Sequence, residues 1–310
     1  MTSIIEVQGL IKRYRGATTN AVDDISFNVA SGEFFTLLGP NGAGKTTTIS
    51  ILTTTLAPTS GLTRIAGYYL AHSASDVRQN IGIIFQQPSL DFNLSAEENI
   101  RFHAILYGLF PFRPTFLSMP RAYRERVQEL AALLGLEHEM SKQVKKLSGG
   151  MRRKLEIIRS LLHKPRVLFL DEPTAGLDPA SRRNLWEYLR KVRYESGTTI
   201  FLTTHYLEEA EEADTICMIN QGKILAYGSP QEVKGHLIEN YLLIDAADRD
   251  RLRSELQRLG IAFSETPFFK IALNGHSAQQ IIKAIDTPLA LVKTHIPTLE
   301  DAYLEILEHA

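Results

Sequence analysis

The chain contains one cysteine and one tryptophan among 310 residues. A single cysteine cannot form an internal disulfide, which excludes the class of small folds held together by disulfides. Cys217 lies in the apolar run TICMI, which is typical of a buried structural thiol. This cysteine usage fits a reducing compartment.

Long apolar runs and an excess of one charge are also missing. No stretch approaches the roughly 18 apolar residues of a membrane span, and the start MTSIIEVQGL lacks the basic and apolar regions of a secretion signal. Lys and Arg number 34 against 35 Asp and Glu, a net charge of -1. We therefore expect a soluble or peripheral protein and no nucleic-acid partner, because there is no global basic field.

Alternating strand and helix patterns follow residue 34 and predict a mainly parallel α/β sheet. The 44% hydrophobic content suits a globular core. Ser95 with Glu98 forms a capping-box pattern, and Asp178-Pro179 is typical of a helix start. The apolar patterns predict strands at 4–14, 21–30, 34–39, 62–67, 81–85, 166–171, 198–204, 215–219 and 224–228.

The pattern changes near YGSPQEVKGH, and we expect two domains, residues 1–235 and 236–310. From Tyr241 the predicted order is strand, helix, strand, strand, helix, strand and a final helix. The order β-α-β-β-α-β indicates a small α+β domain of ferredoxin-like type. No ligand-binding constellation is visible in it, so a stabilising or dimer-contacting element is our preferred interpretation.

The stretch GPNGAGKTT, residues 39–47, carries the strongest chemical signal. Gly39, Gly44, Lys45 and Thr46 match the phosphate-loop pattern between an apolar strand and a helix. Glycines let several backbone N–H groups surround one anion at the positive helix start. Lys45 would reach the β and γ phosphates, and the Thr46 hydroxyl would hold Mg²⁺. The alternative is an ordinary glycine turn.

A second signal is RVLFLDEPTAGLD, an apolar strand that ends in two acids. Adjacent carboxylates are unfavourable unless a positive group compensates, and Mg²⁺ with a phosphate-bound water supplies that reason. Asp171 would lie beside the metal's own ligands, and Glu172 would take a proton from the attacking water. Alone, such a pair is more often a solvated strand end.

The ordered motifs GPNGAGKTT, FQQ, LSGGM, LDEPTAGLD and TTHYLEEAE resemble the ATPase subunit of ABC transporters, over about residues 4–235. The resemblance implies a P-loop ATPase fold with an N-terminal antiparallel β portion and a helical lobe. It also implies an ATP hydrolase coupled to transport, with ATP and Mg²⁺ as cofactors. The catalytic residues would be Lys45, Gln86, Glu172 and His205, and the metal residues Thr46, Gln86 and Asp171. The ATP-binding residues would be Tyr14, which stacks on adenine, and Gly39, Pro40, Asn41, Gly42, Ala43, Gly44, Lys45, Thr46 and Thr47.

The same resemblance implies a second chain. The segment LSGGM lies on a separate helical lobe, so its residues would bind ATP held by a partner ATPase subunit, and a homodimer is expected. The residues that act across this interface would be Ser148, Gly149, Gly150 and Asp178. Met151 stands where this family commonly has glutamine and cannot donate a hydrogen bond. Two interpretations of Arg152, Arg153 and Lys154 are open: electrostatic compensation for Met151, or a basic solvated helix face.

A membrane permease with several spans is the other partner that the resemblance implies, with contact near Gln86–Pro120. Phe110, Phe112 and Phe116 would help to form a socket for it; alternatively, this loop packs on its own lobe. The end KTHIPTLEDAYLEIL resembles ATPases of bacterial exporters for drugs, glycolipids or polysaccharides, which implies a peripheral location on the cytoplasmic face of the inner membrane. A non-transport ATPase acting on a ribosome or another macromolecular complex, such as DNA, is the alternative. Ribosome-acting members usually carry two cassettes in one chain, and DNA-repair members insert a long coiled coil; the sequence shows neither.

Overall fold

The computed structural model describes residues 3–85, 89–175, 177–235, 241–265, 267–273, 277–295 and 298–309. Contacts between residues divide the chain into two compact units, Met1–Tyr227 and Gly228–Ala310. The short helix α8 (Pro230–Gly235) therefore groups with the second unit, whereas the sequence pattern assigned it to the first domain. The extent of the two domains in the folded protein stays a prediction.

A six-stranded sheet forms the centre of the first unit, in the order β10-β9-β3-β8-β7-β6. Its strands are β3 (Phe34–Leu38), β6 (Ile81–Ile84), β7 (Val167–Asp171), β8 (Thr199–Thr204), β9 (Thr215–Asn220) and β10 (Lys223–Gly228). The pairs formed by β3 with β8 and β9, and by β7 with β6 and β8, are parallel. All residues of β3, β7 and β8 are buried, as expected for parallel strands covered on both faces. The predicted parallel sheet is thus confirmed.

Helices α1 (Lys45–Leu52), α6 (Pro179–Ser196) and α7 (Leu207–Ala210) follow strands of this sheet. Asp178 caps α6 as expected, with Pro179 at its first position, and the left-handed Gly197 (φ 63°) ends it. Phe35 stacks between Phe27 and Phe201, at centroid distances of 5.2 and 5.0 Å. These rings join the parallel sheet to the neighbouring antiparallel one.

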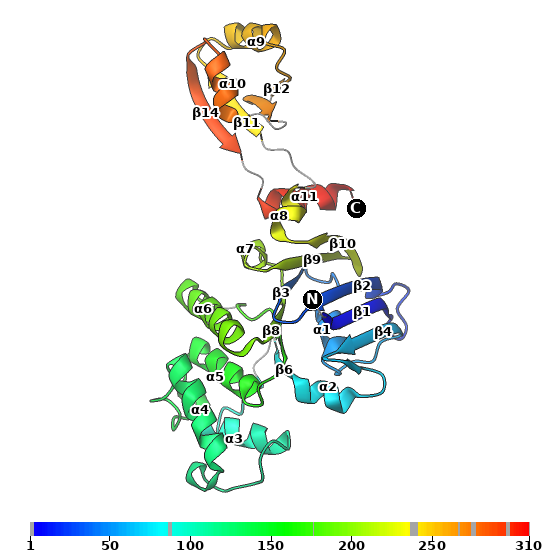
Figure 1. Cartoon of the computed structure of the whole chain (residues 1–310), viewed down its shortest axis with the longest axis vertical. Helices are drawn as coiled ribbons and strands as arrows, with labels where there is room; N and C mark the ends of the chain where they lie inside the picture. The colour runs from blue at the N-terminus through cyan, green and yellow to red at the C-terminus, as the bar shows by residue number, and fades with distance from the viewer. Residues whose placement is uncertain are drawn as a thin grey trace. The chain divides into compact units, whose positions relative to one another are not determined.

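The antiparallel sheet has the order β2-β1-β4-β5. It is formed by β1 (Ser3–Lys12), β2 (Val22–Ala30), β4 (Ser60–Ile65) and the short β5 (Tyr68–Tyr69), and α2 (Ala74–Asn80) follows it. Figure 1 shows this sheet to one side of the parallel one. The expected N-terminal antiparallel portion is confirmed.

Three longer helices form a lobe on the other side of the parallel sheet (Figure 1). They are α3 (Ala96–Leu106), α4 (Arg121–Leu134) and α5 (Gly149–Leu161), with the short 3₁₀ helices η1 (Phe116–Ser118) and η2 (Val144–Lys146) between them. Ser95 and Glu98 form the predicted capping box of α3. Both α3 and α4 pack on α5, so the lobe is organised around α5.

The second unit contains a four-stranded antiparallel sheet in the order β12-β13-β11-β14. Its elements run β11 (Tyr241–Ala246), α9 (Arg249–Arg258), β12 (Ser264–Glu265), β13 (Phe269–Ala272), α10 (Ala278–Ala284), β14 (Leu289–His295) and α11 (Leu299–His309). This is the predicted β-α-β-β-α-β order with a final helix, so the ferredoxin-like type is confirmed. Helix α11 packs against α8 within the unit.

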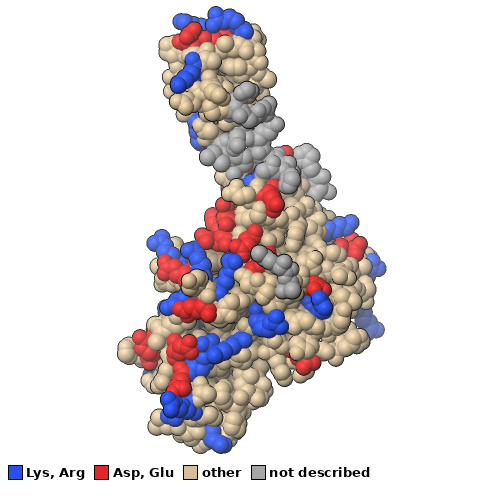
Figure 2. Space-filling view, in the orientation of Figure 1, with Lys and Arg blue, Asp and Glu red and all other residues tan. Residues whose placement is uncertain are grey.

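Across the described ranges, no helix combines the length and apolar character needed to cross a membrane. On the face shown in Figure 2, basic and acidic side chains are interspersed over the first unit.

Candidate functional site

The loop from residue 39 to 44 joins β3 to α1 and is closely packed at two glycines. A Cβ atom on Gly39 would lie 2.2 Å from the Ile219 carbonyl oxygen, and one on Gly44 would lie 2.5 Å from that of Ala21. Gly44 also has φ 107°, a conformation that favours glycine, and it caps α1. The loop therefore lies close against β9 and the residue before β2, and it places the N-terminus of α1 at the carboxyl end of β3.

Lys45 is buried and points back over this loop. Its Nζ atom donates to the carbonyl oxygens of Gly39 at 2.7 Å and Pro40 at 3.0 Å, and it lies 3.4 Å from Glu172 Oε1. Burial lowers the pKa of Lys45, while the Glu172 carboxylate acts in the opposite direction. The ammonium group thus lies between the loop and the end of β7, where an anion in the loop would meet it.

Asp171 and Glu172 lie at the end of β7, next to Lys45 and Thr46. Asp171 is 4% exposed and accepts a hydrogen bond from Thr203 Oγ1 at 2.5 Å. Burial raises the pKa of Asp171, and hydrogen bonds from the hydroxyls of Thr203 and Thr46 lower it. The exposed Thr46 hydroxyl and the buried Asp171 carboxylate are therefore neighbours, as oxygen donors for Mg²⁺ must be.

Glu172 is held in an uncommon backbone conformation, with φ 44°. Its N–H donates to the Thr203 carbonyl oxygen at 3.1 Å, and its Oε1 lies 3.2 Å from Nδ1 of His205. Non-glycine residues with positive φ cost free energy and persist only where the surroundings hold them, frequently at functional sites. The backbone here directs the Glu172 side chain toward Lys45 and His205.

The sheet topology explains this convergence. Strands β3, β8 and β7 are adjacent and parallel, so their carboxyl ends lie at one edge of the sheet. Lys45 follows β3, Glu172 follows β7 and His205 follows β8. The structure thus brings together three of the four predicted catalytic residues. The fourth, Gln86, lies outside the described residues.

Tyr14 lies beside the phosphate loop, although it is distant in the sequence. Its hydroxyl is 3.2 Å from Thr47 Oγ1, and its side chain is 46% exposed. Lys12 Nζ lies 5.6 Å from the centre of the ring. An exposed ring next to a phosphate loop is correctly placed to stack on a base, and that role stays a prediction.

The residues expected to act across an interface form a separate cluster. Ser148 caps α5, accepting from the N–H of Met151 at 3.2 Å, and it is exposed together with Gly149. Asp178 accepts from the backbone N–H and the hydroxyl of Ser181, at 3.0 and 2.6 Å, and these bonds lower its pKa. A Cβ atom on Gly150 would lie 3.0 Å from Ser181 Oγ, so the starts of α5 and α6 are neighbours.

In the described part of the chain, no hydrogen bond or ion pair joins this cluster to the phosphate loop. Met151 is half-buried and lines a cavity of about 120 Å³ that also involves Leu177 and Tyr188. Met151 on α5 is therefore partly packed, and it faces a cavity that α6 also lines.

The burial of two charged residues at this site was not predicted from the sequence. Arg153 is 7% exposed, so the interpretation of a solvated face is wrong for it: its guanidinium bonds to backbone carbonyls inside the first unit. Glu209 is 5% exposed and accepts hydrogen bonds from the hydroxyls of Thr174 and Thr204. Both residues lie in charged runs of sequence, RRK and EEAEE, which give no sign of burial.

The Phe-rich segment before α4 has two environments. Phe110 and Phe116 contact the buried Tyr123 edge-on, with centroids 5.4 and 6.0 Å from it. Phe112 is 61% exposed. Two of the three rings are therefore packed on their own lobe, and Phe112 remains available to a partner.

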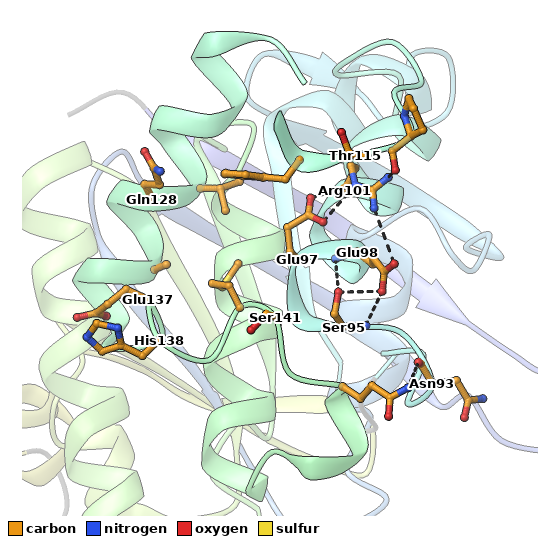
Figure 3. Close-up of a pocket in the computed structure, with 16 residues that line it drawn as sticks. Asn93, Ser95, Glu97, Glu98, Arg101, Thr115, Gln128, Glu137, His138 and Ser141 are labelled. Carbon is orange, nitrogen blue, oxygen red and sulfur yellow. Dashed lines mark hydrogen bonds and ion pairs between the residues drawn. The ribbon is translucent and has the colours of Figure 1, made fainter. Parts of the chain in front are cut away.

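A pocket of about 870 Å³ lies in the same lobe. In Figure 3, Glu97, Glu98 and Arg101 from α3 lie on one side of it, and Gln128, Glu137 and His138 lie on the other. Phe116 also lines it. Arg101 pairs with Glu97 at 3.0 Å and donates to the Pro114 carbonyl at 2.8 Å, which fixes the Phe-rich segment beside the pocket.

Comparison with known proteins gives one consistent result. A family model described as ABC transporter matches residues 22–175. The daunorubicin/doxorubicin resistance ATP-binding protein DrrA of Streptomyces peucetius is 41% identical over 259 residues, covering 83% of this chain and 74% of that protein. The Nod factor export ATP-binding protein I of Cupriavidus metallidurans is 34% identical over 99% of this chain and 98% of its own length.

Solved structures agree with these sequence relatives. The structure of an ATP binding subunit of an ABC transporter has a TM-score of 0.65 at 31% identity, covering 76% of this chain and 93% of that one. A dimeric, post-hydrolysis structure of the ATP-binding cassette MJ0796, bound to ADP and Pi, has a TM-score of 0.64 at 25% identity, covering 73% of this chain and 98% of that one.

Proposed function

The chain belongs to the ABC transporter family as an ATP-binding subunit, and from this premise we propose that two copies close head to tail around two Mg-ATP to drive export through a separate membrane protein. The observation that carries the proposal is the convergence of Lys45, Glu172 and His205 at one sheet edge. The relatives named for drug resistance and Nod factor export support export. They favour a transporter over an ATPase that acts on ribosomes.

Each residue at the sheet edge has a distinct role in this proposal. Lys45 and the loop N–H groups bind the β and γ phosphates, and Tyr14 stacks on adenine. Glu172 takes the proton of the attacking water, oriented by Gln86 and His205. General-base help of this kind is worth roughly 10² to 10⁴ in rate.

Mg²⁺ would be held by the Thr46 hydroxyl, with Asp171 and Gln86 next to it. No group of three or more His, Cys, Asp or Glu side chains in the described residues forms a dedicated metal cage. A magnesium ion bound through one hydroxyl, phosphate oxygens and water needs no such cage. The ion supplies charge neutralisation for the phosphates.

The second chain explains the exposed start of α5. Ser148, Gly149 and Gly150 would bind the γ-phosphate held by Lys45 of the other copy, at the positive end of the helix. Asp178, beside this segment, would cross the same interface. Loss of the γ-phosphate then removes contacts that hold the copies closed, which lets hydrolysis do mechanical work. The dimeric MJ0796 structure supports this arrangement.

A permease would contact the helical lobe within Gln86–Pro120. The exposed Phe112 and the 870 Å³ pocket beside α3 offer an apolar anchor next to charged walls. Such a contact places the chain on the cytoplasmic face of the inner membrane. Drugs and molecules like Nod factor are the proposed class of exported substrate, from the names of the relatives.

Two substitutions test the proposal. Glu172→Gln should trap a closed dimer loaded with ATP, because the base is lost and the binding groups remain. Lys45→Ala should weaken ATP binding itself. Gel filtration with Mg-ATP and steady-state hydrolysis distinguish the two. Hydrolysis by Glu172→Gln at the parent rate would show that the base assignment is wrong.

A further inference from the structure

Helix α5 carries a buried ion pair just after its exposed start. Arg153 is 7% exposed and Glu156 is 2% exposed, and Arg153 Nη1 lies 2.9 Å from Glu156 Oε2. Removing two charges from water is unfavourable, and their attraction offsets this only when further hydrogen bonds satisfy both groups. The other hydrogen bonds of Arg153 and Glu156 therefore indicate what the ion pair does.

Arg153 joins two backbone segments that carry catalytic residues. Its Nη1 donates to the Phe85 carbonyl oxygen at 2.7 Å, and its Nε donates to that of Pro173 at 3.1 Å. Phe85 immediately precedes Gln86. Pro173 immediately follows Glu172. One planar guanidinium thus holds the peptide groups next to the water-orienting residue and next to the base.

Two further residues of α5, Glu156 and Arg159, bond to Ser89, which lies a few residues after Phe85 in the chain. Glu156 Oε1 accepts from the Ser89 N–H at 3.1 Å, and Arg159 Nη1 donates to the Ser89 carbonyl at 2.6 Å. Phe85 and Ser89 flank residues 86–88. Both flanks are therefore attached to α5, one through Arg153 and the other through Glu156 and Arg159.

The strand arrangement makes this bridge effective. Strands β6 and β7 are parallel neighbours, with Ile84 opposite Leu170. Phe85 and Glu172 continue these strands beyond their carboxyl ends. Because adjacent strand ends can separate once pairing stops, a side chain that bonds to both continuations fixes their spacing. Arginine suits this task because donors on two separate nitrogens, Nε and Nη1, reach the two carbonyls, whereas the three donors of lysine share one nitrogen that cannot occupy both positions.

We propose that Arg153 is a positioning residue: through the Pro173 and Phe85 carbonyls it sets Glu172 of its own chain, from the helix whose start binds ATP held by the other chain. This inference rests on the proposed head-to-tail dimer. A shift of α5 when Ser148 meets the γ-phosphate at one site would then be passed to the catalytic residues of the second site. The two ATP sites are coupled through one helix.

The test uses the full chain with Arg153→Lys, which keeps a positive charge beside Glu156 but cannot hold both carbonyls. The expected result is a fall in kcat of about 10- to 100-fold, the scale of a misplaced catalytic group, with KM unchanged. In a Glu172→Gln background, the same change should leave the ATP-dependent dimer intact. This separates positioning of the base from binding of the nucleotide.

A second variant protects the test against simple misfolding. Arg153→Gln combined with Glu156→Gln removes both charges of the pair, so neither is left buried without its partner. It should reproduce the fall in kcat with dimer formation retained. The matched control is Arg121→Gln, which breaks an exposed ion pair with Glu125 in the same lobe and should change neither quantity.

Two results would overturn the inference. One is parent-like kcat in both Arg153 variants. The other is loss of the ATP-dependent dimer in parallel with kcat. Arg153 would then act in the binding of ATP by the start of α5, or in folding, instead of in positioning Glu172. The Glu172→Gln protein with Arg153 intact reports on the proposed function separately, because a wrong base assignment leaves it as active as the parent.

Discussion

Glu172 Oε1 lies 3.2 Å from His205 Nδ1, across the neighbouring ends of β7 and β8. The same oxygen lies 3.4 Å from Lys45 Nζ. The carboxylate is thus located between the ammonium group proposed to bind phosphate and a histidine at the next strand end. A γ-phosphate bound by Lys45 and the water that attacks it would both lie within reach of Glu172.

Replacing His205 by alanine should lower hydrolysis while ATP binding remains. His205 contacts Glu172 and makes no hydrogen bond to the phosphate loop in the described residues. Its loss should therefore affect the orientation of the attacking water rather than the binding of ATP. We expect kcat to fall about 100-fold, the scale of a misplaced catalytic group. Steady-state kinetics and nucleotide titration measure the two effects. His72→Ala, at an exposed histidine of the same unit, is the control; an equal loss of ATP affinity in His205→Ala would contradict the assignment.

Replacing Tyr14 by alanine should weaken ATP binding, whereas phenylalanine should preserve it. Stacking of a base on an aromatic ring is worth about 1 kcal/mol or more, or roughly fivefold in affinity. Tyr14→Phe keeps the ring and loses only the contact of the hydroxyl with Thr47. Titration with a fluorescent ATP analogue measures this difference. Tyr68→Ala, at another exposed tyrosine of the antiparallel sheet, should bind ATP normally. Equal affinity in all four proteins would exclude stacking on Tyr14.

Much of the fold and the backbone conformation of the phosphate loop could be predicted from local sequence. Strand formation and helix capping depend on residues close together in the sequence, so a short stretch shows the pattern. Ser95 and Asp178, for example, cap helices through bonds to residues three positions later. The φ of 107° at Gly44 favours glycine, so this backbone requirement appears in the sequence as a fixed glycine of the motif.

Burial of charged residues could not be derived in this way. Arg153 and Glu209 receive their partners from segments far along the chain, the former from Phe85 and the latter from Thr174. Their local sequence is a run of charges, which predicts solvent exposure. The packing of Phe110 and Phe116 could not be derived from the sequence either, because their contact with Tyr123 is seen only in the folded lobe.

Replacing Phe112 by serine should weaken assembly with the permease and leave the ATPase chain folded. Phe112 is 61% exposed and makes no ring contact in the described residues, so little packing is lost. An aromatic anchor at an interface is typically worth more than 1 kcal/mol, so we expect affinity to fall by about 10-fold. Binding to the co-expressed permease in detergent measures it.

Tyr194→Ser on α6, where the side chain is 93% exposed, is the control and should assemble normally. Phe110→Ser should behave differently, because it removes the edge-on contact with Tyr123 and lowers stability by about 1 kcal/mol. Normal assembly of the Phe112→Ser protein would remove this side chain from the proposed contact.

Replacing Glu255 by glutamine should weaken the second unit at neutral pH and reduce its sensitivity to acid. Glu255 on α9 accepts hydrogen bonds from the hydroxyl and N–H of Thr287, at 2.5 and 2.9 Å, and from the Asp286 N–H at 2.8 Å. The Thr287 hydroxyl, followed by the backbone bond from Asp286, lowers the pKa of Glu255 below its ordinary value of 4.5. A folded-state pKa below the unfolded one contributes stability above pH 4.5 that is lost as pH falls through the folded value.

Hydrogen exchange of the α9 amides in the full chain, corrected for intrinsic rates, should therefore show protection that falls in acid for the parent. For Glu255→Gln, this protection should fall less. Asp250→Asn changes an exposed carboxylate of the same helix and should follow the parent. Identical pH profiles for the parent and Glu255→Gln would mean that this carboxylate does not link α9 to the segment before β14 in its ionised form.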